Sequence, residues 1–250
     1  MRKPLIAFSI LLFAISANAA DRRLHRTAQL DPNGSVSIDT HNGSVVVTAW
    51  NQPTVDVSAV ILPAEFGNDE DVQKTDVKVT GSGGSVRIES DYTDVPTHFT
   101  WLGFSRNLPP IQYTISVPAT ARLYVDAHNA SIKVNALRND VRISTHNGDI
   151  DIRDLDGGLN VESHNGDVRA SFLRFAKSAR VETHNGSIDL GLPSQARFHV
   201  NASGHHMGVS SDFAININSM RDSQYVGDVN GGGPEVRVST HNGSLKLRKL

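Results

Sequence analysis

Hydrophobic and polar residues alternate along most of this chain, and the phase of the alternation shifts by one at a recurring triplet, His-Asn-Gly. Before one copy of the triplet Val141 and Ile143 share odd parity, whereas Ile150 and Ile152 after it share even parity. Such alternation is typical of half-buried strands, in which every second side chain points to the same side. We therefore predict that two strands meet at each triplet and bury their apolar residues inside a corner.

The triplet recurs with nearly the same neighbours, as THNGSV, AHNASI, THNGDI, SHNGDV, THNGSI and THNGSL. The histidines of four successive copies, His128, His146, His164 and His184, are separated by 18, 18 and 20 residues. A fixed period of about 20 residues is the signature of stacked structural repeats. Continued along the chain, the count places weaker corners at Gly208 and Gly227 before the last copy of the motif.

Parity also predicts the orientation of the corner residues: Thr145 and Asn147 inward, and His146 outward. Gly148 supplies the positive φ that a tight corner needs, and stacked asparagine amides can form a ladder. The residues expected to shape the corners are Asn42, Gly43, Asn129, Asn147, Gly148, Asn165, Gly166, Asn185, Gly186, Asn242 and Gly243. Some of these asparagines begin Asn-x-Ser patterns, but an inward asparagine is inaccessible to glycosylation, so we interpret them as structural.

Two architectures fit the repeat. In a parallel solenoid, equivalent corners stack about 4.8 Å apart, whereas in an antiparallel meander each Asn-Gly forms a hairpin and equivalent turns lie about 10 Å apart. The near-identity of successive corners favours stacking. We predict an all-β protein with a single parallel β-solenoid, a flattened coil of about 18–20 residues per rung.

The sequence divides into a leader and one domain. Residues 1–20 read as a signal peptide, with Arg2 and Lys3 before an apolar run and an Ala-x-Ala cleavage site at residues 17–19. Residues 21–250 form the solenoid domain, in which an irregular insertion at 63–110 precedes regular repeats at 111–250. We expect a β-rich N-terminal segment, a hairpin around the glycines at 81–84, and no helix outside the leader.

Composition narrows the function classes. The 250-residue chain has a formal charge of −2, which is too mild to indicate nucleic acid or an anionic membrane as a partner. No second long apolar run follows the leader, so no transmembrane segment is expected. The chain has no cysteine, which excludes disulfides, thiol catalysis, cysteine-ligated zinc and a lipid anchor on an N-terminal cysteine. These features predict an exported chain, periplasmic or at the cell surface, that is not a lipoprotein.

Three blocks in order carry a family resemblance: residues 43–50 followed by 55–57, residues 111–118, and residues 231–238 followed by the last THNGSL. On these blocks, and over nearly all of the mature chain, the sequence resembles the bacterial "putative adhesin" family, a domain of unknown function built of β-strand repeats. The resemblance implies a parallel β-solenoid, no catalytic residue and no cofactor. This chain departs from the family pattern in placing histidine before the corner asparagine six times.

The candidates for catalysis are the abundant aspartates Asp149, Asp151, Asp154, Asp156 and Asp167. A polysaccharide-cleaving enzyme needs a carboxylate pair at a defined separation, with one raised pKa, or a metal. Most of these aspartates alternate outward, which favours a solvated polar face. The chain also lacks a nucleophile elbow, a HExxH helix, a P-loop and a dinucleotide fingerprint.

Two other groups are candidates for binding. Outward stacking of His128, His146, His164 and His184 would align imidazoles, which suit zinc, copper and nickel; the alternative is an exposed column that only reflects repeat duplication. Phe99, Trp101 and Phe104 crowd one loop of the insertion, where they either form a contact site or cover an end of the solenoid.

Together these observations predict a non-catalytic, adhesin-like binding or structural module of the bacterial cell envelope, with no cofactor. Its partner is not identified by the sequence, although a surface glycan or an envelope protein fits a long regular face. A metal-binding or pH-responsive protein that uses the histidines is the alternative, and a polysaccharide-active enzyme is a third.

Overall fold

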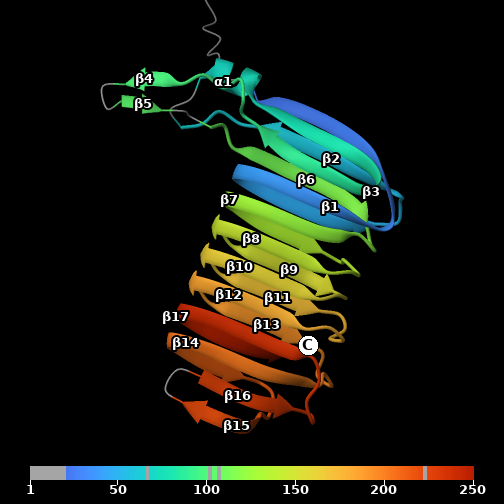
Figure 1. Cartoon of the computed structure of the whole chain (residues 1–250), viewed down its shortest axis with the longest axis vertical. Helices are drawn as coiled ribbons and strands as arrows, with labels where there is room; N and C mark the ends of the chain where they lie inside the picture. The colour runs from blue at the N-terminus through green and yellow to red at the C-terminus, as the bar shows by residue number, and fades with distance from the viewer. Residues whose placement is uncertain (1–20, 66–67, 101–102, 106–107, 222–223) are drawn as a thin grey trace, which may run out of the picture.

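A computed structural model describes residues 21–65, 68–100, 103–105, 108–221 and 224–250. The predicted signal peptide at 1–20 lies outside the described residues, as does Trp101. Figure 1 shows the strands stacked one above another along the long axis of the molecule. The elements, in chain order, are β1 (Arg22–Trp50), β2 (Thr54–Ile61), α1 (Asp69–Lys74), β3 (Asp76–Asp91), β4 (His98–Thr100), β5 (Gly103–Ser105), β6 (Ile111–Pro118), β7 (Arg122–Asn135), β8 (Val141–Asn147), β9 (Ile150–Leu155), β10 (Leu159–Asn165), β11 (Val168–Phe172), β12 (Ala179–Asn185), β13 (Ile188–Leu192), β14 (Phe198–Ser211), β15 (Asn216–Arg221), β16 (Gln224–Val229) and β17 (Glu235–Lys249).

Each rung of the solenoid consists of two strands that meet at a His-Asn-Gly corner. In the middle of the chain the corner separates β8 from β9, β10 from β11 and β12 from β13, whereas β1, β7, β14 and β17 run through it without a break. Neighbouring rungs pair in parallel, and Asn147 faces both Asn129 and Asn165. The all-β parallel solenoid is therefore confirmed, and the antiparallel meander is excluded as the arrangement of these corners.

The alternating apolar residues form one core between the two strands of each rung. Ile150, Ile152, Val168, Ile188 and Leu190, all predicted to point inward, are at most 1% exposed. In successive rungs Ile132, Ile150, Val168, Ile188 and Leu245 occupy the same register position. Burial of apolar surface in such columns is the main favourable contribution to the stability of the coil.

The corners differ from the prediction in the orientation of asparagine. Thr145 is buried and His146 exposed, as expected, but Asn147 and Asn165 are only half-buried, and Asn129, Asn185 and Asn242 are exposed. The amides nevertheless form a ladder at the surface, in which each Nδ2 donates to the Oδ1 of the preceding rung at 2.6–3.0 Å. The backbone turns at the corner and takes the asparagine out of strict alternation. Inaccessibility is therefore no argument against glycosylation of these residues.

Glycine is required at the corners for two different reasons. Gly166 has φ of 140°, in the region that residues with a Cβ rarely adopt. At Gly186 φ lies outside that region, but a Cβ would lie 2.0 Å from the carbonyl oxygen of Gly166 in the rung below. The prediction of positive φ is confirmed at Gly43, Gly148 and Gly166, whereas close stacking of the rungs explains Gly186 and Gly243.

The order of the rungs does not follow the order of the chain. β17 pairs with β12 and β13 on one side and with β14 on the other, so the last strand is inserted one rung inside the stack. β1 is likewise inserted, between β3 and β6 on one side and β7 on the other. The linear count of corners is therefore wrong at this end: Met207 faces Gly243, and Gly227 lies in the antiparallel strand β16.

The two ends of the stack carry antiparallel strands. At one end the first residues of β1 pair with β2, and β2 pairs with β6; at the other, β16 pairs with β14 and β15. Residues 81–84 do not close the expected hairpin, because the second half of β3 pairs in parallel with β1. The hairpin of the insertion is instead formed by β4 and β5.

The structure contains a helix, α1, that was not predicted from the sequence. Asn68 caps it, and its side chain accepts from the backbone N–H of Asp71, whose carboxylate accepts from the backbone of Asn68. This capping box is readable as Asn-x-x-Asp in the sequence. In the described part of the chain no helix has the length and apolar character needed to cross a membrane.

The asparagines of the amide ladder are expected to contribute unequally to the stability of the fold. Asn165 donates to Asn147 and accepts from Asn185, whereas Asn242, at the end of the ladder, only donates to Asn185. With about 0.5–1.5 kcal/mol for each hydrogen bond, Asn165→Ala should lower the free energy of unfolding by about 1–3 kcal/mol and Asn242→Ala by about half as much. Urea denaturation of both variants measures the difference. An equal or larger loss in Asn242→Ala would show that the ladder does not stabilise the corners.

Candidate functional site

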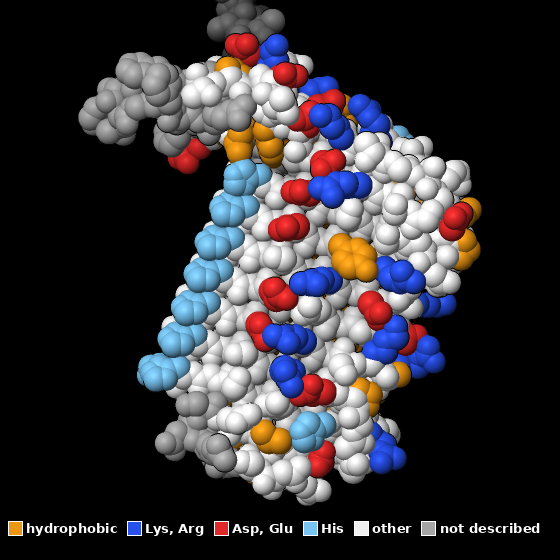
Figure 2. All heavy atoms as spheres, viewed as in Figure 1, with side chains coloured by type: hydrophobic (Ala, Val, Ile, Leu, Met, Phe, Trp, Pro, Cys, Tyr) orange, Lys and Arg blue, Asp and Glu red, His pale blue; other side chains and the backbone are white. Residues whose placement is uncertain are grey.

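The most regular feature of the surface is a column of histidines along one edge of the solenoid (Figure 2). Within the described residues it comprises, in spatial order, His41, His128, His146, His164, His184, His241 and His205. From His128 to His205 the rings lie face to face, with centroids 4.8–5.3 Å apart and planes within 9° of parallel. His41 and His128 are equally close, at 4.8 Å, but their planes are tilted by 57°.

The column forms because every corner presents its first residue outward at the same register. The four predicted members, His128, His146, His164 and His184, are brought together as expected. His41 and His241 also belong to the column and were not predicted there, because the prediction assumed that the rungs follow chain order. His205 stacks on His241, and His206 lies beside His205.

A second row of side chains runs parallel to the column, two residues earlier on the same strands. We call it the carboxylate row; its members in spatial order are Asp39, Asp126, Ser144, Glu162, Glu182, Ser239 and Ser203. Arg142 pairs with Glu162 at 3.4 Å, and Arg180 pairs with Glu182 at 2.6 Å. Partial burial, and then the nearby charge of Asp126, raise the pKa of Asp39 above its usual value, although Arg87 opposes the shift.

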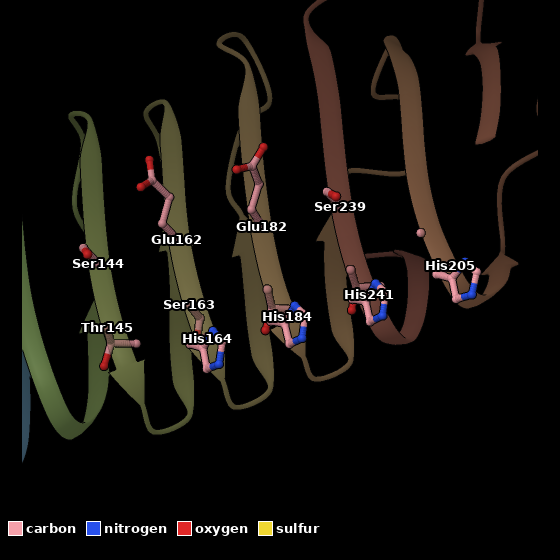
Figure 3. A pocket seen from close by; sticks show the side chains of 13 residues that line it. Ser144, Thr145, Glu162, Ser163, His164, Glu182, His184, His205, Ser239 and His241 are labelled. Carbon is pink, nitrogen blue, oxygen red and sulfur yellow. The ribbon is translucent and has the colours of Figure 1, made fainter. Parts of the chain in front are cut away.

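Between the histidine column and the carboxylate row lies an open groove of about 480 Å³ that crosses the rungs from β8 to β14 (Figure 3). Glu162 and Glu182 line one side, and His164, His184, His241 and His205 line the other. In Figure 3 the two glutamate side chains point away from the histidines of their own strands. We call the outward surface that carries the column, the row and the groove the histidine face.

The stacked geometry limits how the column can bind metal. Metal–nitrogen bonds of about 2.0–2.1 Å place two nitrogens on one ion no more than about 4.2 Å apart. Equivalent nitrogens of parallel rings are separated by the same vector as the centroids, here 4.8–5.3 Å. Neighbouring stacked rings therefore cannot share an ion through equivalent nitrogens. Within the described residues no three His, Asp or Glu side chains converge on a metal position as they stand.

Four of the five aspartates that were candidates for catalysis have local partners for their carboxylates; Asp154 is the exception among the described contacts. Asp149 and Asp167 each accept from a backbone N–H of the next rung, at 3.0 and 2.9 Å. Asp151 pairs with Arg153 at 2.6 Å, and Asp156 pairs with Arg174 at 2.5 Å. These contacts fit the interpretation of a polar outer surface.

The aromatic candidates stay a prediction. Phe99 in β4 and Phe104 in β5 face each other across the hairpin, and Trp101 lies outside the described residues. The hairpin extends away from the end of the stack (Figure 1).

The chain is similar to a known protein family and to several solved structures. Residues 29–248 match the Toastrack DUF4097 family. Among solved structures, a "putative cell adhesion protein" from Clostridium sporogenes is 12% identical, with 92% of this chain and 100% of that chain covered and a TM-score of 0.46. A "putative adhesin" from Bacteroides fragilis is 16% identical, with coverages of 90% and 97% and a TM-score of 0.41.

No curated protein matches the sequence. The structural similarities are too distant to carry a functional argument, whereas the family match spans most of the chain and agrees with the resemblance found in the sequence blocks. The chain belongs to the Toastrack DUF4097 family.

Proposed function

We propose that this protein is an exported, non-catalytic, adhesin-like binding module of the bacterial cell envelope, and that the histidine face is its binding surface. The observation that carries the proposal is the groove along that face, with a histidine from each rung on one wall and a serine or glutamate on the other. A ligand lying in the groove would run parallel to the long axis of the solenoid, across the strands. Such a site suits an extended polymer better than a compact small molecule.

The chemistry of the groove favours a glycan over an envelope protein as the ligand. The imidazole rings cover one another's faces, so mainly their edges, which carry the ring nitrogens, are available. The glutamates add carboxylate acceptors, and Ser144 and Ser239 add hydroxyls. This is a surface for hydrogen bonds with a polyhydroxylated chain, and among the described residues the groove lining includes no Phe, Tyr, Trp, Leu, Ile or Met, the kinds of anchor common in protein interfaces.

A hydrolytic role is less well supported. Asp39 and Asp126 are neighbours on adjacent rungs, and the pKa of Asp39 is raised, which are two features of a carboxylate pair in a glycosidase. The side chain of Asp39 is 59% exposed, however, and an open polar surface does not provide the apolar pocket that keeps a general acid protonated.

Binding can be tested on an array of purified bacterial surface polysaccharides. Glu162→Gln with Glu182→Gln removes two carboxylates from the groove and should weaken binding by at least about tenfold, equivalent to about 1.4 kcal/mol. Asp151→Asn with Asp189→Asn is the control, because it removes two carboxylates from the opposite strands. If the parent retains no polysaccharide, or if both double variants bind like the parent, the glycan proposal is wrong.

Export can be tested by fractionating bacterial cells that express the full chain. Because residues 1–20 have the organisation of a signal peptide, the chain should reach the periplasm or medium shortened by about 20 residues. A variant lacking residues 2–20 should stay in the cytoplasm. An uncleaved, cytoplasmic full-length chain would contradict export.

A pH-responsive role is a second candidate, favoured by the length of the histidine column. Two unit charges about 5 Å apart repel each other by about 1 kcal/mol even in water, so protonation of neighbouring rings opposes stacking. Carboxylates around the column offset part of this repulsion; they are Asp39, Glu89, Asp126, Glu162 and Glu182 on the strands, and Asp149 and Asp167 beyond the corners. Tyr92 adjoins His41, and His206 adjoins His205, at the two ends of the column.

Lowering the pH from about 7.5 to 5 should therefore destabilise the fold, because the folded chain holds the rings at this spacing and the unfolded chain does not. Thermal melting of the parent and of His146→Gln with His164→Gln measures the effect, which should be smaller in the variant. Asp91 does not contribute to the change in stability between about pH 7.5 and 5. The hydrogen bond from Lys78 is the main cause that lowers its pKa to about 2, so its stabilisation is lost only as the pH falls below about 4. An equal acid effect in parent and variant would leave the column without a role in pH response.

A further inference from the structure

The histidine column is not uniform, and its first two members differ from the rest. His41 and His128 are the one neighbouring pair in the described column whose rings are tilted, by 57°, while their centroids remain 4.8 Å apart. A tilted pair is not bound by the limit on equivalent nitrogens of parallel rings. Rotation about the side-chain bonds of half-buried His41 and exposed His128 can bring one nitrogen of each ring to a common point.

Two carboxylates accompany this pair on the same side of the sheet. Asp39 and Asp126 face each other across β1 and β7, and each lies two residues before its histidine. Neighbouring strands are about 4.8 Å apart, and two residues along a strand span about 6.6 Å. The backbone positions of the four residues therefore form a small rectangle. Their side chains all line a hollow of about 380 Å³.

The charge of this rectangle is poorly compensated. Asp126 has no hydrogen bond or ion pair within the described residues, and Arg87 approaches Asp39 at only 3.5 Å while holding Glu89 at 2.7 Å. Among the described residues, these two neighbouring carboxylates share one nearby guanidinium, which also binds Glu89. A cation placed between the two carboxylates would balance their charge.

The chain contains a second rectangle with the same pattern, formed by Glu162, His164, Glu182 and His184. Its glutamates are occupied by Arg142 and Arg180, and its rings are parallel to within 2°. This rectangle has the same kinds of metal-binding group, but its rings are not tilted and its carboxylates are paired with arginines. It therefore serves as an internal control in a test of metal binding.

We propose that Asp39, His41, Asp126 and His128 form a binding site for a divalent transition metal ion, with Zn²⁺ as the best match. Two imidazole nitrogens and two carboxylate oxygens are a donor set that zinc accepts in four-coordinate geometry, and copper and nickel also bind imidazole. The side chains move from their present positions to close on the ion. Binding replaces the repulsion between the two aspartates by attraction to a shared cation and ties β1 to β7 at the surface.

Isothermal titration of the metal-free protein with Zn²⁺ alone tests the site. The parent should bind about one strongly held ion per chain, and Asp126→Asn with His128→Gln should weaken that binding by at least about tenfold. Glu182→Gln with His184→Gln removes one carboxylate and one column histidine from the second rectangle, and should leave the affinity within about twofold of the parent. Circular dichroism of all three proteins confirms that each is folded.

A second readout separates a specific site from adsorption along the column. Zn²⁺ should shift the ring resonances of His41 and His128 in NMR spectra of the parent before those of His164 and His184. The proposal is overturned if the parent binds no Zn²⁺, if the Asp126 and His128 variant binds as tightly as the parent, or if both double variants lose affinity equally. Because this test uses the metal and not a glycan, its failure would leave the proposed binding function untouched.

Discussion

Parallel, in-register hydrogen bonding between neighbouring rungs is the interaction on which the rest of this structure depends. The bonds continue through the corners, where Gly148 N donates to Asn165 O and Gly166 N to Asn185 O, both at 3.0 Å. With this register fixed, each residue lies above its counterpart in the rung below. The apolar columns of the core, the amide ladder and the histidine column are three consequences of the same pairing, on the inside, at the corner and on the surface.

Stacking of identical residues favours side chains that carry no net charge at neutral pH, because a column of one fixed charge repels itself. The chain meets this constraint differently in different columns. Histidine and asparagine repeat nearly without interruption. On the opposite strands, Lys133, Asp151, Arg169, Asp189 and Lys246 follow one another with alternating sign. In the carboxylate row, serines at Ser144 and Ser239 interrupt the acids, and arginines pair with two of them.

The two proposals rest on different features of the polar rows: the groove on their repetition, and the metal site on a pair of acids whose charge is poorly balanced. A regular groove arises because every rung along it contributes a histidine on one side and a serine or glutamate on the other, which is the basis for expecting an extended ligand. Asp39 and Asp126 are the neighbouring carboxylates of the row that no arginine holds closely, which is the basis for expecting a cation there. The antiparallel strands at both ends of the stack cover edges that would otherwise continue to pair with other chains.

Strand periodicity and a period of 18–20 residues were enough to predict the repeat, the inward residues and the outward histidines, because they leave few other packings. The sequence also determined the need for glycine at the corners. Only the tertiary structure decided which rung lies beside which. Since β1 and β17 carry the same corner motif as their neighbours, local pattern does not distinguish a terminal place in the stack from an inserted one, and the inserted order is what completes the histidine column with His41, His241 and His205. The outward turn of the corner asparagines was likewise decided by backbone geometry, because parity along a strand holds only while the chain stays extended.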